Sequence, residues 1–111
     1  MNVGFDFTNN KLIIRIDGDI DHHTCEEIRN KVDQEINRRN PKSIIFDMKN
    51  VNFMDSSGIG VIIGRYKLIM TSGGITTMIN VKPQIKRVYD ICGLKKIIPI
   101  YENEKDAVES I

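Results

Sequence analysis

Apolar residues recur along this chain with two different periods, which predict helices and strands in alternation. From residue 25 to residue 36 they are spaced three or four positions apart and form one helical stripe, made of Cys25, Ile28, Val32 and Ile36. Asn40-Pro41 ends this helix of about 14 residues. Further helices are predicted from about residue 57 to 71, from 83 to 91 and over 105–111. Short apolar runs between turn residues predict strands at 3–7, 11–17, 43–48, 75–80 and 97–101.

The predicted elements follow one another in the order ββαβαβαβα. Thr8-Asn9-Asn10 is a turn signal, so the first two strands are expected to form a hairpin. Strands that alternate with helices imply an α/β fold with a largely parallel sheet, to which the hairpin adds an antiparallel edge. In such sheets the ligand-facing loops lie at the carboxyl ends of the strands. Two unusual loops are expected there, at 18–24 and 50–58.

The second and third helices are each expected to bury one apolar stripe. In the second helix the stripe is Ile59, Ile62, Ile63, Tyr66, Ile69 and Met70. Arg65, Val61 and Lys67 lie off it, and the last two are expected to face a partner. The stripe of the third helix is Ile85, Val88, Tyr89 and Ile91. Thr24 and Glu27 are spaced as a capping box for the first helix.

Composition narrows the possible functions. The chain has 111 residues, with 16 Lys and Arg against 15 Asp and Glu, so its net charge is +1. A near-neutral domain lacks the basic footprint of a nucleic-acid-binding protein and any polybasic membrane signal. No stretch reaches the roughly 18–20 apolar residues of a membrane span, and Met1–Asp6 does not start a signal peptide. Cys25 and Cys92 lie far apart and form no disulfide framework, which favours a reducing cytoplasm.

The sequence contains no clear motif of an enzyme active site. His22-His23 could suggest a metal site, but zinc needs three or four ligands, no second His or Cys cluster exists, and a loop leading into the first helix is the favoured interpretation. Gly58-Ile59-Gly60 matches neither a dinucleotide fingerprint nor a phosphate-binding loop. Met54 and Gly58 flank Ser56 where a nucleophile elbow has its two glycines, so the first glycine is missing and a catalytic triad is disfavoured.

The segment Asp55-Ser56-Ser57-Gly58 is the most informative feature of the chain. Asp and Ser are strong helix N-caps, so a plain cap is one interpretation. Three cap-type residues in a row exceed what one helix start requires, and the first-turn amides also favour an anion. A phosphate on a serine here would add about −1.5 to −2 charge to a near-neutral domain, enough to control binding.

At these residues the sequence resembles the STAS family, and within it the bacterial anti-sigma factor antagonists that act in sporulation. The matching strings span nearly the whole chain and are Gly18-Asp19-Ile20-Asp21-His22-His23-Thr24, Phe53-Met54-Asp55-Ser56-Ser57-Gly58-Ile59-Gly60-Val61, Gly64-Arg65-Tyr66-Lys67 and Gly93-Leu94-Lys95-Lys96-Ile97-Ile98. Asp19 is one departure, because the family pattern has Glu there.

The resemblance implies a single STAS domain over 1–111, with a four- or five-stranded, mostly parallel mixed sheet flanked by about four helices. It also implies a switch between partners and no enzyme activity. The unphosphorylated antagonist binds an anti-sigma factor that is also a serine kinase, and this frees a sporulation sigma factor. The kinase then phosphorylates the antagonist and lowers its affinity, and a phosphatase reverses the modification. ADP or ATP is carried by the kinase, so the antagonist has no cofactor or metal of its own.

By the same resemblance the phosphate acceptor is Ser56. Asp21 matches an acidic residue that contacts the kinase, and it is expected at the interface and not in the core. The full expected contact surface is Asp21, His22, Asp55, Ser57, Gly58, Ile59 and Gly60. A glycine inside a helix, such as Gly60, costs about 1 kcal/mol relative to alanine, so either a core neighbour or a partner is expected to approach it closely. The free chain is expected to be a monomer. The alternative function is a STAS-type module that binds a nucleotide or another small ligand.

Overall fold

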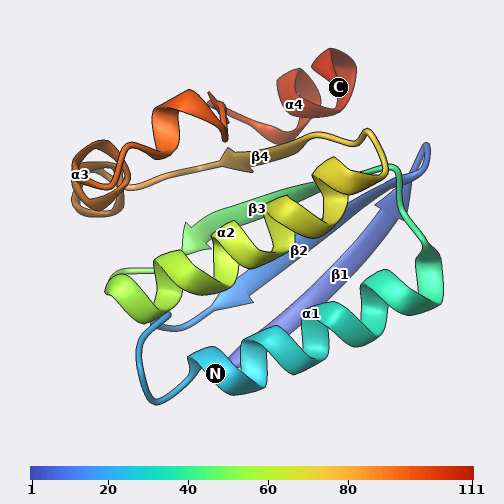
Figure 1. Ribbon diagram of the computed structural model, residues 1–111. Helices are drawn as coiled ribbons and strands as arrows, with labels where there is room; N and C mark the ends of the chain where they lie inside the picture. The colour runs from blue at the N-terminus through green and yellow to red at the C-terminus, as the bar shows by residue number, and fades with distance from the viewer.

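The computed structural model describes residues 1–111 and forms one α/β domain (Figure 1). Its elements are β1 (Asn2–Thr8), β2 (Lys11–Asp17), α1 (Cys25–Arg39), β3 (Ser43–Asn50), α2 (Ser56–Thr71), β4 (Thr76–Ile79), α3 (Pro83–Ile91), the 3-10 turn η1 (Leu94–Lys96), β5 (Ile100–Tyr101) and α4 (Glu104–Ser110). The predicted order is confirmed, with η1 as an addition. None of these helices has both the length and the apolar character that crossing a bilayer requires.

The five strands form one mixed sheet in the order β1-β2-β3-β4-β5. β1 and β2 pair antiparallel, and every other neighbouring pair is parallel, as predicted. The hairpin turns at Asn9 and Asn10, whose φ angles are +49° and +66°. Asparagine tolerates this left-handed conformation, which matches the twist of the two strands.

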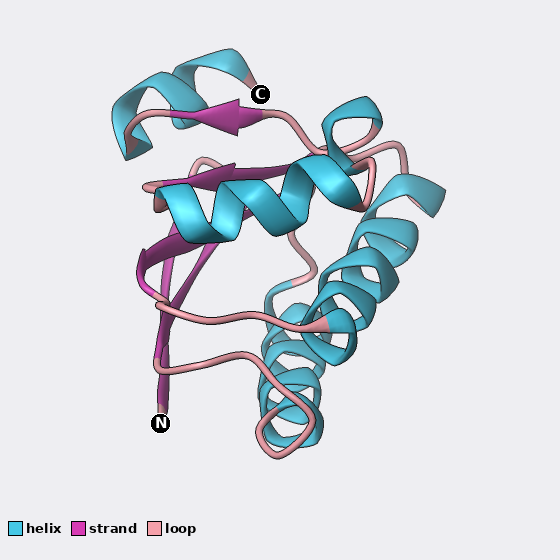
Figure 2. Cartoon of the chain, turned by 90° about the vertical axis from the view of Figure 1, so that its left-hand side faces the viewer, coloured by secondary structure: helices cyan, strands magenta, loops and turns pink.

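The sheet is covered on both faces, which is why its central strands read as nearly continuous apolar runs. α1, α2 and α3 pack on one face and build the larger core with Leu12, Ile14, Ile16, Ile44 and Phe46. Figure 2 shows the sheet edge-on with α1 and α2 to one side of it. The opposite face has a smaller core, in which α4 supplies Ala107 against Ile13, Ile45 and Ile79.

The stripe predicted for α2 is wrong in part. Ile59, Ile62 and Ile69 are buried and Lys67 is exposed, as expected, but Met70 is half exposed. Val61 and Arg65, which were expected outside the core, are buried. The reason is that α2 packs against α1 as well as against the sheet, so its buried arc is wider than a single stripe. Val61 therefore presents no surface to a partner.

The end of the chain also departs from the pattern. Ile91 was expected in the core of α3, but it is 80% exposed at the last residue of the helix. The last strand was expected at 97–101 but begins only at Ile100, because the amides of Ile97 and Ile98 both donate to the carbonyl of Leu94 in η1. The Tyr89 hydroxyl donates a hydrogen bond of 2.6 Å to the Ile98 carbonyl and fixes this segment against α3.

Candidate functional site

The two loops singled out in the sequence lie side by side at the carboxyl ends of β2 and β3. The Ile20 amide donates to the Phe53 carbonyl at 3.0 Å, and the Asp55 amide donates to the Ile20 carbonyl at 3.3 Å. These contacts make a short parallel bridge between Ile20 and Met54. The pairing of β2 with β3 thus resumes beyond the strand ends, and it brings the loop before α1 next to the start of α2.

Asp55 is the N-cap of α2 and also contacts the neighbouring loop. Its Oδ1 accepts hydrogen bonds from the amides of Ser57 at 2.9 Å and Gly58 at 3.2 Å. Its Oδ2 accepts from the His22 amide at 3.3 Å. One carboxylate therefore satisfies the first-turn donors of α2 and holds the loop before α1 in place.

Ser56 is the first residue of α2 and is exposed, and no group of the domain hydrogen-bonds to its hydroxyl. Ser57 is the second residue and is half-buried. The cap is therefore Asp55, while both serines lie in the first turn. This arrangement leaves the Ser56 hydroxyl free to react with a group brought by another molecule.

Asp21 organises the loop in which it lies. Its Oδ1 accepts hydrogen bonds from the amides of His23 at 2.9 Å and Thr24 at 3.1 Å, and its own amide donates to the Thr24 hydroxyl at 3.1 Å. Desolvation raises the pKa of Asp21, but these donors outweigh it and hold the pKa below its usual value. Asp21 is partly exposed, outside the core as expected, but its carboxylate also shapes the loop.

The predicted capping box of Thr24 and Glu27 is wrong. The Thr24 hydroxyl makes no bond to the amides of α1 and donates instead to the Asp19 carbonyl at 2.7 Å. The reason is that Asp21 already closes the turn that leads into the helix, since its carbonyl accepts from the amide of Cys25 at 2.8 Å.

Three expected contact residues follow in α2 and differ in what they can touch. Gly58 and Ile59 are buried. A Cβ on Gly58 would lie 2.5 Å from the Ile20 carbonyl oxygen, so only glycine lets the bridge between the two loops form. Gly60 is exposed, and nothing of the domain lies within 4 Å of the place of its Cβ. No core neighbour approaches Gly60, so of the two expected reasons for a glycine there the core neighbour is excluded.

Sequence reasoning overlooked two residues beside this site. Phe53 is half exposed in the loop that leads to Ser56. Asn52, its neighbour, accepts a hydrogen bond from the Lys82 ammonium, which joins this loop to the start of α3. Several lysines follow residue 81, and this local excess of positive charge could have pointed to Lys82. The net charge of the whole chain does not reveal it, because acidic residues elsewhere balance it. The site therefore extends from the two paired loops towards α3.

The two adjacent histidines do not form part of a metal-binding cluster. His22 and His23 lie with their ring centroids 5.6 Å apart, and the domain has no group of three His, Cys, Asp or Glu side chains that could hold a metal ion. The chemistry that this geometry offers is a free serine hydroxyl at a helix N-terminus.

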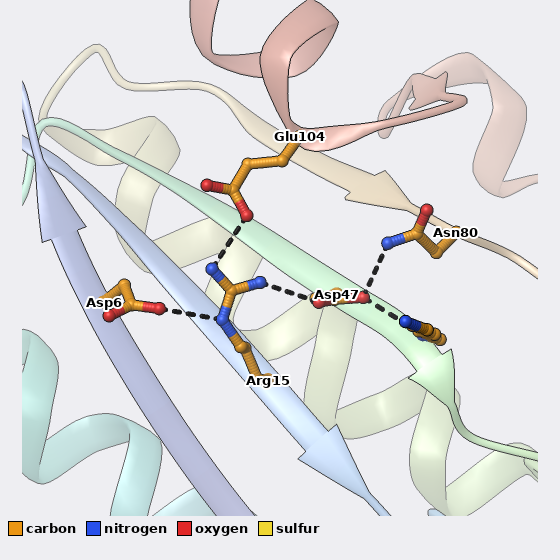
Figure 3. A network of polar contacts seen from close by, with 6 residues as sticks. Asp6, Arg15, Asp47, Asn80 and Glu104 are labelled. Carbon is orange, nitrogen blue, oxygen red and sulfur yellow. Dashed lines mark hydrogen bonds and ion pairs between the residues drawn. The ribbon is translucent and has the colours of Figure 1, made fainter.

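A network of ion pairs lies on the face of the sheet that α4 covers, opposite α1 and α2 (Figure 3). The Arg15 guanidinium contacts the carboxylates of Asp6 and Asp47 at 2.8 Å and that of Glu104 at 2.7 Å. Burial lowers the pKa of Arg15, but these three carboxylates raise it overall above its usual value. Because its partners come from β1, β3 and α4, Arg15 ties the hairpin and the last helix to the centre of the sheet.

Asp47 is the buried member of this network. Desolvation raises its pKa, but hydrogen bonds from Asn80 and the Lys49 amide, together with Arg15, hold the pKa below its usual value. Asp47 lies near the carboxyl end of β3, on the strand that leads to Ser56. The network therefore stabilises the position of that strand.

The chain is similar to known proteins over nearly its whole length. The family model of the STAS domain matches residues 3–107. An anti-sigma F factor antagonist of Paenibacillus polymyxa is 47% identical over 100 residues, which cover 90% of this chain and 86% of the relative. The sequence resemblance to the family is thus confirmed over nearly the whole chain.

Solved structures give the same result. The anti-sigma factor antagonist SpoIIAA in its unphosphorylated form superposes with a TM-score of 0.82 at 29% identity, covering 97% of this chain and 94% of that one. The phosphorylated form of the Bacillus cell fate determinant SpoIIAA superposes with a TM-score of 0.74 at 29% identity, covering 97% of both chains. These relatives are regulatory proteins, and with the five-stranded mixed sheet, the two paired loops and the matched length they show that the chain belongs to the STAS family, among its anti-sigma factor antagonists.

Proposed function

We propose that this protein switches a sporulation sigma factor on by binding its anti-sigma factor, and that phosphorylation of Ser56 ends this binding. The observation that carries the proposal is the position of Ser56, exposed at the first residue of α2 with its hydroxyl unbonded. Binding would take place in the cytoplasm, where a released sigma factor meets RNA polymerase.

The phosphoryl transfer requires only that the hydroxyl be presented. The Ser56 oxygen would attack the γ-phosphorus of ATP held by the anti-sigma factor acting as a kinase. The bond to the leaving ADP breaks, and the serine proton passes to a base of the kinase. A helix N-terminus is open to an approaching partner and tolerates the resulting dianion. A phosphatase would restore the hydroxyl by hydrolysis.

The surroundings of Ser56 explain how a phosphate would change binding. Asp55 directly precedes the exposed serine, and Asp21 lies in the neighbouring loop that Asp55 contacts through the His22 amide. A phosphate adds about −1.5 to −2 charge at the same place. We propose that Asp21, His22, Asp55, Ser57 and Gly60 form the surface that meets the kinase, with Gly58 and Ile59 supporting it from inside.

Incubation with the cognate anti-sigma factor and ATP, followed by intact mass measurement and site mapping, tests this proposal. The wild-type chain is expected to gain one phosphate on Ser56, and Ser56→Ala to gain none. Ser110→Ala, at an exposed serine of α4 outside this surface, is the matched control and should still be modified. Phosphate on Ser56→Ala would contradict the assignment, and tight binding of ATP by this chain alone would favour the small-ligand module instead.

A further inference from the structure

Positive charge is concentrated in one short part of this domain. Residues 82–96 contain five basic side chains, which we call the α3–η1 basic surface: Lys82, Lys86, Arg87, Lys95 and Lys96. The same segment has one acidic residue, Asp90, so its net charge is 5 − 1 = +4. The rest of the chain has 11 basic and 14 acidic residues, a net charge of −3. The net charge of the whole chain is therefore near zero although its basic and acidic residues are unevenly distributed along the sequence.

The domain itself neutralises little of this charge. Lys86 is the one member with an ion pair, to Asp90 at 3.2 Å. Lys95 and Lys86 flank a hollow of about 340 Å³ whose other lining residues are Tyr89, Pro99 and Ile100. Ile91, the most exposed large apolar side chain, lies one helical turn after Arg87. A large exposed apolar side chain on a helix that also carries basic residues is typical of a protein interface.

This surface is continuous with the phosphorylation site. Lys82 donates a hydrogen bond to Asn52, four residues before Ser56. β3 and β4 are parallel neighbours, so their carboxyl ends lie at the same end of the sheet. The loops that follow them, which lead to Ser56 and to α3, therefore start close together (Figure 1). A partner that covers Ser56 can therefore extend onto α3.

We propose that the anti-sigma factor docks an acidic face on the α3–η1 basic surface. This inference rests on the proposed function, and the direction of the switch supports it. An acidic face is attracted by a segment of charge +4 and is repelled by a phosphate dianion placed beside it. A basic partner face would instead be held more tightly after phosphorylation. A modification that releases the partner by charge repulsion therefore fits an acidic partner face here.

The test is the association rate of the full chain with its cognate anti-sigma factor in the presence of ADP, measured at low and high salt. Lys95→Glu should slow association by roughly 3- to 10-fold at low salt and reduce its salt dependence. Lys105→Glu is the matched control: it makes the same change in net charge on an exposed lysine of α4, across the sheet. It should stay within about 2-fold of the wild type.

The outcomes separate this inference from the proposed function. If the wild type binds and the Lys95→Glu and Lys105→Glu chains associate at equal rates at low salt, the docking surface is overturned. The proposed switch is then unaffected. A wild-type chain that neither binds the anti-sigma factor nor gains phosphate would overturn the proposed function itself. At long incubation Lys95→Glu should still gain one phosphate on Ser56, because the substitution lowers the association rate and does not alter the acceptor serine.

Discussion

Asp55 Oδ2 lies 3.3 Å from the backbone nitrogen of His22, so the residue that caps α2 also holds the loop before α1. These two residues are 33 positions apart in the sequence. The contact makes the shape of one loop depend on the start of the other helix. Any change at the first turn of α2 therefore acts on the paired loops together.

Removal of this carboxylate is expected to destabilise the domain. Asp55→Ala leaves the amides of Ser57, Gly58 and His22 without their partner, and loss of an N-cap costs about 1–2 kcal/mol. Urea denaturation measures the change in free energy of unfolding. Asp19→Ala is the control, because the Asp19 side chain is exposed and makes no hydrogen bond. Equal stability of the two variants would show that the Asp55 cap contributes nothing.

Two glycines of α2 are expected to respond in opposite directions to the same substitution. Gly58→Ala should lower the free energy of unfolding by about 2–3 kcal/mol, because the new Cβ meets the Ile20 carbonyl at 2.5 Å. Gly60→Ala should raise it by up to about 1 kcal/mol, because alanine favours a helix and finds open space there. Thermal or chemical unfolding of both variants checks this, and a loss of stability in Gly60→Ala would point to internal packing at that position.

Asp47 is expected to make stability depend on acid pH. Its folded-state pKa lies below the unfolded value of about 3.9, so it contributes stability above that pH and loses it as the pH falls through the folded value. Asp47→Asn should be less stable than the wild type at pH 7 by about 1–3 kcal/mol. The two unfolding curves, measured from pH 7 to pH 2, should converge at the acid end. A constant difference at every pH would assign the loss to packing.

The two partners of the ion pair between α1 and α2, of which only Arg65 is buried, are expected to respond unequally to substitution. Arg65 Nε lies 2.9 Å from Asp33 Oδ1, but the geometry makes no hydrogen bond and leaves the guanidinium otherwise unpartnered. Burial lowers the pKa of Arg65, and Asp33 only partly opposes this. Asp33→Ala should cost about 3 kcal/mol because it leaves a buried charge, while Arg65→Met should cost far less. Chemical denaturation compares the two, and the reverse order would contradict this account.

The sequence by itself was enough to place most of the secondary structure. Period-2 and period-3.6 patterns are local properties, so they located the strands and helices within a few residues and put Ser56 at a helix start. The order of elements then predicted a mostly parallel sheet and the two loops at its carboxyl edge. Four motif strings, with Asp55-Ser56-Ser57-Gly58 in one of them, also indicated the STAS family.

Only the tertiary structure decided which side chains of these elements are buried. Val61 and Arg65 are inside because α1 covers a second side of α2, whereas Ile91 is outside because nothing covers the end of α3. Gly58, and not Gly60, meets a close neighbour inside the domain, because the chain that approaches α2 is the loop around Ile20. Local periodicity carries no information about such neighbours, since each is set by the pairing of segments more than 30 residues apart.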